Sequence, residues 1–143
     1  MHTVTGGCRC GNFEVALTLS KPPGEFTARE CGCSFCVSRK GRHVSDPAGA
    51  VTIAIADESL WNKHRFGTGT CDFMICTKCD SYMGAVGETP AGLKAVINVW
   101  CLDTPDVFTK TAPSDFEGED VANRLARRAR NWTPATLAIG RGG

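Results

Sequence analysis

Three cysteines within six residues, Cys31, Cys33 and Cys36, constrain this chain more than any other feature of its sequence. Reduced thiolates at this spacing compete for one soft cation, and Zn²⁺ is the usual occupant of such sites inside cells. Zinc usually takes four ligands, and this segment offers three. The fourth is either another side chain, which would close a structural site, or an open position for water or a substrate thiolate. The segment by itself is compatible with both.

The cysteine content and the lack of targeting signals bear on the compartment. The chain has nine cysteines in 143 residues and a formal net charge of +1, which argues neither for nor against acidic partners. Residues 1–7 show no basic region followed by an apolar stretch, and no apolar run approaches the roughly 20 residues of a membrane span. We therefore expect a cytoplasmic protein with no signal peptide and no membrane contact. Thiols stay reduced there, so metal binding is favoured over disulfides, the weaker alternative.

Alternating apolar and polar residues predict a mostly β fold. Segments 13–19 and 51–56 have the period of two that is typical of strands with one buried face. Shorter apolar segments at 73–75, 82–86 and 93–102 predict three more strands, separated by turns rich in proline and glycine. Short strands in this arrangement indicate small antiparallel sheets.

The C-terminal region differs from the rest of the chain. Apolar residues recur there at helical spacing and predict a helix over about 118–132, which Pro134 ends. Four arginines on this helix could contact nucleic acid, but we favour a solvated face over an apolar stripe and expect no nucleic-acid partner. No repeat or linker interrupts the sequence, so we expect a single domain over residues 1–143. The four arginines are Arg124, Arg127, Arg128 and Arg130.

The other cysteines fall into two pairs that complete one metal site by counting. A C-x-C pair and a C-x-x-C pair together supply four thiolates, which closes a tetrahedral structural zinc site and leaves the triplet as a second site. Joining the triplet to one distant cysteine would strand a member of a pair. A metal ion that joins the N-terminal turn to the middle of the chain closes a long loop. Closing a long loop is where a metal gives the most stability in principle. The two pairs are Cys8 with Cys10 and Cys76 with Cys79.

Residues outside these groups have weaker claims to a role at the metal. Cys71 is an alternative fourth ligand for the triplet, and His43 and His64 are comparable outsiders. Cys101 lies in an apolar segment and is expected to be a small buried hydrophobe. Three cations that follow the triplet could form a positive rim that binds the carboxylates of a thiol substrate, or could belong to a solvated loop. These cations are Arg39, Lys40 and Arg42.

Four sequence segments, taken together, resemble one known family. Gly7-Cys-Arg-Cys-Gly11, the C-x-C-S-x-C stretch that ends at Gly41, Arg65-Phe-Gly67 and the C-x-x-C at Cys76 resemble the glutathione-dependent formaldehyde-activating enzymes (GFA), or CENP-V-type domains, over about residues 3–110. The resemblance implies an Mss4-like "β-tent" fold. It also implies a structural zinc on the two cysteine pairs and an active-site zinc on the triplet. Departures from the family pattern are Gly32, Cys71 and Asp80, and Asp80 tolerates the left-handed backbone that a glycine would adopt there.

The best-known reaction of that family joins glutathione and formaldehyde into S-hydroxymethylglutathione. The leading hypothesis is therefore a zinc-dependent carbon–sulfur lyase-type enzyme that acts on a small thiol adduct, with glutathione as candidate substrate and two zinc ions per chain, the second partly occupied. Zinc on three thiolates would still deprotonate an incoming thiol. The alternative is a non-catalytic zinc-binding interaction module, or a thiol or zinc sensor. A homodimer is one option for the oligomeric state, which the sequence leaves open.

Overall fold

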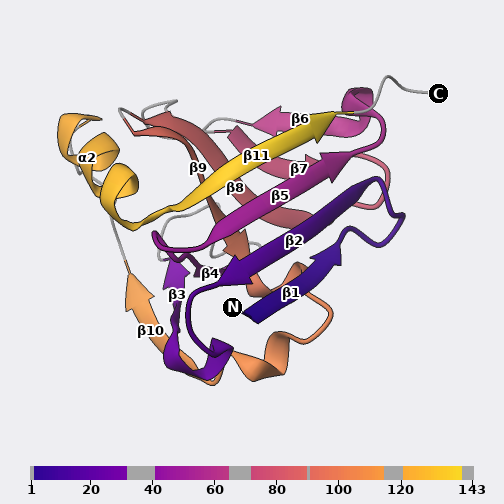
Figure 1. Cartoon of the computed structure of the whole chain (residues 1–143). Helices are drawn as coiled ribbons and strands as arrows, with labels where there is room; N and C mark the ends of the chain where they lie inside the picture. The colour runs from indigo at the N-terminus through magenta and orange to yellow at the C-terminus, as the bar shows by residue number, and fades with distance from the viewer. Residues whose placement is uncertain (1, 32–40, 65–71, 90, 115–120, 140–143) are drawn as a thin grey trace.

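The computed structural model of the chain describes residues 2–31, 41–64, 72–89, 91–114 and 121–139. Strands dominate this part of the chain, so the prediction of a mostly β fold is confirmed, and one short helix, α2 (Val121–Asn131), accompanies them (Figure 1). The strands are β1 (His2–Gly7), β2 (Phe13–Leu19), β3 (Thr27–Cys31), β4 (Arg42–Val44), β5 (Ala50–Ile55), β6 (Trp61–His64), β7 (Asp72–Cys76), β8 (Tyr82–Thr89), β9 (Gly92–Asn98), β10 (Lys110–Ser114) and β11 (Thr133–Ile139).

The described strands form one curled sheet. Its main path runs β1-β2-β5-β11-β9-β4-β3-β10, and β8, β7 and β6 extend from β9 as a branch. Most neighbours are antiparallel, as predicted. Two pairs, β11 with β5 and β10 with β3, are parallel, so the expectation of antiparallel sheets does not hold for these two pairs. Both parallel pairs join strands far apart in the sequence, and such pairs need long crossover connections that local turn signals do not reveal.

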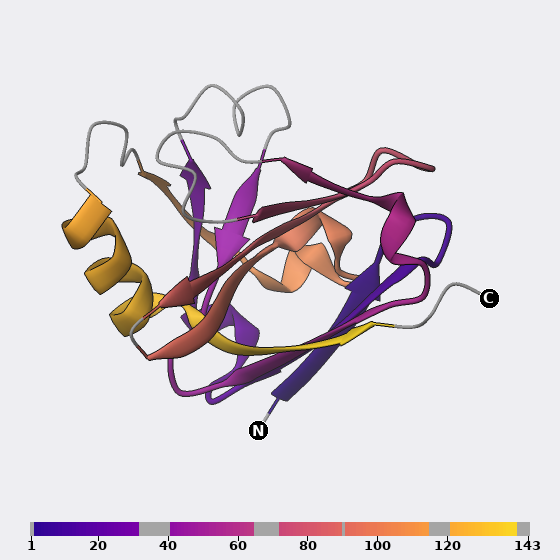
Figure 2. The ribbon, with the colours of Figure 1, turned by 90° about the horizontal axis from the view of Figure 1, so that it is seen from above.

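The curled sheet encloses the core between its two halves. Figure 2 shows the half that contains β1, β2, β5 and β11 facing the half that contains β8 and β9, with α2 on the outside. Alternate residues of β2 and β5 point inward, as their period of two predicts, and each fully buried apolar side chain stabilises the fold by about 1.5–3 kcal/mol. The largest side chains packed in this core include Phe13, Leu17, Ile53, Ile55, Met74, Met83 and Ile97.

Strand boundaries differ from the prediction where a polar side chain accepts a hydrogen bond from the nearby backbone and starts a turn. The apolar segment 93–102 is not one strand: β9 ends at Asn98, whose side-chain oxygen accepts a hydrogen bond from the Trp100 N–H and starts a 3₁₀ turn over Val99–Cys101. Similarly, Asp57 caps a 3₁₀ turn over Glu58–Leu60 before β6 begins. A side chain that bonds the backbone locally competes with the sheet, so apolarity alone overestimates strand length.

The C-terminal segment after the helix is part of the sheet. Helix α2 ends at Asn131, close to the predicted end, but the chain then forms β11 between β5 and β9. Pro134 lies at the start of β11 and does not merely end the helix. No helix among the described residues is long and apolar enough to cross a membrane.

One side of the molecule gathers several strand ends. The ends of β3, β6 and β10 and the beginnings of β4 and β7 lie together there (Figure 2). Cys31 is the last residue of β3 and Arg42 is the first of β4, so the described chain on either side of the three-cysteine segment reaches this side.

Candidate metal centre and the neighbouring polar face

The first cysteine pair lies in the turn between β1 and β2. Gly7 has φ 155° and Gly11 has φ 84°, conformations that glycine adopts readily and that let the chain turn tightly around Cys8 and Cys10. The Gly11 N–H donates to the Cys8 carbonyl at 3.1 Å, and the Phe13 N–H donates to the Cys8 sulfur at 3.2 Å. Backbone N–H groups aimed at sulfur favour the thiolate form that binds metals.

The second pair lies in the turn between β7 and β8. The Asp80 N–H donates to the Cys76 carbonyl at 2.8 Å and closes the turn. Asp80 has φ 58°, which confirms the expectation that this residue occupies a left-handed conformation. The Cys76 N–H donates in turn to the Ser81 carbonyl at 3.0 Å, so both turns present their sulfurs from hydrogen-bonded backbone.

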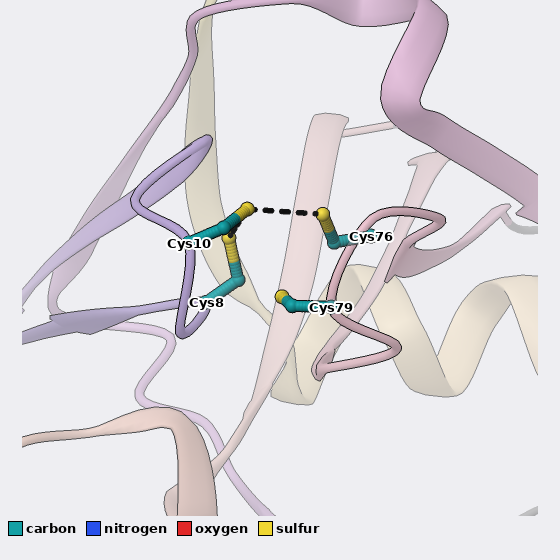
Figure 3. A group of neighbouring side chains, drawn as sticks. All are labelled: Cys8, Cys10, Cys76 and Cys79. Carbon is teal, nitrogen blue, oxygen red and sulfur yellow. Dashed lines mark hydrogen bonds between the residues drawn. The ribbon is translucent and has the colours of Figure 1, made fainter.

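The two turns lie against each other and bring four sulfurs together (Figure 3). The Arg9 side chain donates to the Cys79 carbonyl, and the Arg9 N–H lies 3.4 Å from the Ser81 hydroxyl oxygen. Sulfur–sulfur distances are 3.5 Å for Cys8–Cys10 and for Cys10–Cys76, and all four sulfurs lie within 4.8 Å of one another. Zinc–sulfur bonds of about 2.3 Å in a tetrahedron put sulfurs about 3.8 Å apart. The cluster therefore fits one tetrahedral metal ion.

The pKa values of Cys8, Cys76 and Cys79 show what a cation would change. Burial raises the pKa of Cys8 and raises that of Cys76 to about 12. Burial acts in the same direction on Cys79, but hydrogen bonds involving Ser81 and the Cys10 backbone outweigh it and lower the pKa of Cys79 to about 5. Without a cation, Cys8 and Cys76 therefore favour the thiol, while Cys79 favours the thiolate. A bound dication would displace the remaining protons, since metal ligands must be thiolates.

A second polar group lies on the outer face of the sheet, below the gathered strand ends. His43 on β4 is 8% exposed, and its Nε2 lies 2.7 Å from the Tyr82 hydroxyl in a hydrogen bond. The Asn98 side chain donates to the Tyr82 carbonyl at 3.0 Å, and the Phe73 ring packs edge-on against Tyr82 with centroids 6.0 Å apart. Tyr82 follows the Cys76–Cys79 turn, so the hydrogen bond between Tyr82 and His43 links the four-sulfur cluster to β4.

We expect His43 to make the protein less stable in mild acid. Burial, and then the positive charge of Arg29, lower the pKa of His43 from 6.5 to about 4. The unfolded chain therefore takes up a proton that the folded chain refuses. The contribution of His43 to the free energy of unfolding is therefore fully present above pH 6.5. It falls by about 2 kcal/mol near pH 5, and the loss levels off below pH 4.

Acid also competes with metal for thiolates, so a matched variant is needed to isolate the histidine. Denaturant unfolding of wild type and His43→Gln at pH 7.5 and pH 5 separates the two effects, because both proteins share the metal contribution. The wild type should lose about 2 kcal/mol more than the variant over this interval. Equal losses would mean that His43 is not held neutral.

Comparison with known proteins gives the family of the chain. The family model of the glutathione-dependent formaldehyde-activating enzymes matches residues 3–117. The chain belongs to the GFA family. A crystal structure of a Rhodobacter sphaeroides protein is similar at 20% identity, with a TM-score of 0.57 over 77% of this chain and 99% of that chain, a likeness of fold alone. Among curated proteins, none matches the sequence.

The structure describes some of the site residues that the sequence predicts and leaves others outside its described part. It brings Cys8, Cys10, Cys76 and Cys79 together as predicted, and Cys31 lies at the end of β3. Cys101, expected to be buried, is partly buried against the core, its thiol points to the Met83 carbonyl at 3.8 Å, and burial raises its pKa to about 12. Several predicted residues lie outside the described part of the chain: Cys33, Cys36, Arg39, Lys40 and Cys71.

Arg42 is the one member of the predicted cationic rim that the structure describes. Its Nη2 donates to the Phe108 carbonyl at 3.2 Å, and its guanidinium lies 5.2 Å from the centre of the Trp100 ring. Its Nε is 4.0 Å from a carboxylate oxygen of Glu30. Arg42 thus supports the half-exposed Trp100, while its role in substrate binding stays a prediction.

Sequence reasoning had not singled out the polar face around His43 and Tyr82. The signal that could have found it is the period of two in the strands that flank the triplet. Arg29 and His43 are register partners in β3 and β4, so their side chains share one face of the sheet.

Proposed function

We propose that this protein is a zinc-dependent carbon–sulfur lyase-type enzyme that acts on a small thiol adduct such as S-hydroxymethylglutathione. The match of the GFA family model to residues 3–117 carries this proposal. The four-sulfur cluster supports its structural half, because Cys8, Cys10, Cys76 and Cys79 have the number, spacing and chemistry for a closed zinc site. A closed site has no position for substrate, so the chemistry needs a second place in the chain.

That second place is the three-cysteine segment, where we propose that Cys31, Cys33 and Cys36 hold an active-site zinc. Zinc there would lower the pKa of a substrate thiol and favour the thiolate at neutral pH. Cys31 ends β3 and Arg42 begins β4, so this segment is joined at both ends to strands of the sheet. Arg39, Lys40 and Arg42 are proposed to contact the substrate.

The reaction is balanced without a redox partner. In the direction of cleavage, the hydroxyl proton of the adduct R–S–CH₂–OH leaves, the carbon–oxygen double bond forms, and the carbon–sulfur bond breaks. Its electron pair stays on sulfur as the thiolate, which is reprotonated on release. In the reverse direction the thiolate attacks the aldehyde carbon and the new alkoxide takes up a proton. We further propose one domain over residues 1–143 and a cytoplasmic location, where glutathione is reduced.

We expect the zinc-loaded protein to accelerate exchange between free formaldehyde and S-hydroxymethylglutathione. Magnetisation-transfer NMR with ¹³C-formaldehyde measures this exchange directly, above the uncatalysed rate. Cys33→Ser should abolish the acceleration, because it removes a proposed active-site ligand while leaving the four-sulfur cluster intact. Cys101→Ser is the matched control and should keep it. A wild-type protein with full zinc content and no acceleration would leave a different thiol adduct or a non-catalytic module as the function.

A further inference from the structure

The four sulfurs of the cluster differ in how far solvent reaches them. Cys76 is fully buried and Cys8 is 8% exposed, so the core encloses both of these residues. Cys79 is partly buried, whereas Cys10 is exposed. Oxidation of a cysteine depends on the accessibility of its sulfur and on its thiolate character. A small oxidant in solution therefore reaches the four-sulfur cluster first at Cys10.

Hydrogen bonds separate Cys10 from its neighbours in the same way. The Phe13 N–H donates to the Cys8 sulfur at 3.2 Å, and the Ser81 hydroxyl oxygen lies 3.2 Å from the Cys79 sulfur, to whose thiolate form it donates. Among the described residues, the Cys10 sulfur has hydrogen-bond contacts with other sulfur atoms and with no N–H or O–H group. A hydrogen bond stabilises the charge of a thiolate, and a more stable thiolate is a weaker nucleophile. Cys10 is therefore exposed and also lacks this protection.

Two other sulfurs lie close enough to Cys10 to form a disulfide with it after oxidation. The Cys10 sulfur is 3.5 Å from that of Cys8 and 3.5 Å from that of Cys76 (Figure 3). Cys8 belongs to the same tight turn, with one residue between, which leaves little freedom to reach the dihedral angle of about 90° that a disulfide requires. Cys76 approaches from the opposite turn, on a separate stretch of backbone. Cys76 is therefore the better-placed partner.

We propose that Cys10 is an oxidation site, at which a small peroxide converts the four-sulfur cluster to a Cys10–Cys76 disulfide and releases the metal ion. The oxidation site goes beyond the proposed function, because it lies in the closed cluster and involves no residue of the three-cysteine segment. Zinc joins the two turns in the reduced protein, and oxidation removes the thiolates that hold it. Exchange with a small thiol such as glutathione reduces the disulfide and restores the site.

The reaction is balanced with peroxide as the oxidant. The Cys10 thiolate attacks one peroxide oxygen, the oxygen–oxygen bond breaks, and hydroxide leaves, so that Cys10 becomes a sulfenic acid. The Cys76 thiolate then attacks the sulfur of the sulfenic acid, the sulfur–oxygen bond breaks, and a second hydroxide leaves as the disulfide forms. The two sulfurs together lose two electrons, which reduce one peroxide to two hydroxide ions, and protons from the buffer convert these to water. Two thiolates remain, fewer than zinc sites in proteins use, so the ion leaves.

A peptide map of the oxidised wild type tests the proposal without any substitution. Zinc-loaded protein is treated with an equimolar amount of hydrogen peroxide, the remaining thiols are blocked with N-ethylmaleimide, and mass spectrometry locates the modified cysteines. Dimedone, which traps sulfenic acids, should label Cys10 first, and the Cys10 peptide should then appear linked to the Cys76 peptide. A chromogenic indicator should register free zinc in step with this link. First modification at Cys8 or Cys79, or a disulfide between Cys8 and Cys10, would overturn the proposal.

The kinetics of zinc release give a second test with matched variants. Replacing the three-cysteine segment by serines (Cys31→Ser, Cys33→Ser and Cys36→Ser together) leaves the four-sulfur cluster as the source of zinc. In this background Cys10→His keeps four ligands, since histidine also binds zinc, but removes the sulfur that peroxide attacks. Peroxide-dependent release should slow by about 10-fold or more. Cys79→His is the matched control, keeps Cys10, and should release zinc within about twofold of the background rate.

Thermal melts and zinc content before oxidation show which variants are folded and loaded. Equal release rates for Cys10→His and Cys79→His would mean that attack does not begin at Cys10 and would contradict the proposal. If Cys10→His does not fold, the peptide map of the wild type decides the question. None of these readouts is enzymatic activity, so the proposed reaction can fail while the oxidation site stands, and the oxidation site can fail while the reaction stands.

Discussion

Cys76→Ser should lower the melting temperature by more than about 10 °C or prevent folding altogether. Cys76 is fully buried at the end of β7, and its sulfur lies 3.5 Å from that of Cys10. Structural zinc contributes about 10–16 kcal/mol in small zinc-binding peptides, which is as large as the whole stability of a typical domain. Loss of about 5 kcal/mol of this contribution corresponds to about 10–20 °C in a chain of this length.

Two control variants make the Cys76 result specific to the four-sulfur cluster. Cys101→Ser changes a partly buried cysteine that is not a proposed ligand and should cost no more than about 1–2 kcal/mol. Cys33→Ser changes a proposed ligand of the second site and should leave the melting temperature close to that of the wild type. Differential scanning calorimetry with zinc present makes the comparison. Equal losses for Cys76→Ser and Cys33→Ser would contradict the division into a structural and an active-site metal.

The second large effect is expected at Gly7. This residue has φ 155°, and a Cβ added to it would overlap the carbonyl oxygen of Phe13 in the neighbouring strand. Both strands are held by backbone pairing, so neither can move aside cheaply. Backbone strain and overpacking each cost about 1–3 kcal/mol, and Gly7→Ala should therefore destabilise the protein by about 3 kcal/mol or more.

Gly11→Ala is the matched control for Gly7→Ala. Gly11 also has a positive φ, 84°, but an added Cβ would meet no atom within 4 Å. It should cost about 1–2 kcal/mol, the strain of the left-handed conformation alone. Because Gly7 precedes Cys8, the Gly7 variant should also hold zinc less tightly, as competition with a chelator would show. Similar unfolding free energies for the two variants would mean that the close approach to Phe13 is unimportant.

The sequence predicted the four-sulfur cluster better than it predicted the sheet. The C-x-C and C-x-x-C spacings place cysteines in tight turns, and local glycines and Asp80 fix those turns, so counting ligands sufficed to pair Cys8 and Cys10 with Cys76 and Cys79. Strand β11 was missed because a proline at its start and its short apolar pattern resemble a helix end. Its position between β5 and β9 depends on packing across the whole chain, which no local pattern encodes.

The polar face was missed for a related reason. Arg29, His43 and Tyr82 are ordinary residues of three strands, and none lies in a recognisable motif. The pairing of β3 with β4 makes Arg29 and His43 neighbours. The register between β7 and β8 shifts next to Gly84, which has φ 135°, and this irregularity accompanies the position of Tyr82 on the same face. The polar face therefore depends on how the strands pair rather than on the spacing of residues in the sequence.

Cobalt-substituted protein titrated with glutathione tests most directly whether the three-cysteine segment presents a thiol-binding metal. Co²⁺ replaces zinc in tetrahedral thiolate sites and reports each new sulfur ligand by its absorption. We predict about two cobalt ions per chain, because seven cysteines divide into a set of four and a set of three. Glutathione should then increase the thiolate-to-cobalt absorption, S-methylglutathione should not, and Cys33→Ser should lose the response while keeping one cobalt. A single cobalt per chain, or a spectrum that glutathione leaves unchanged, would contradict the account.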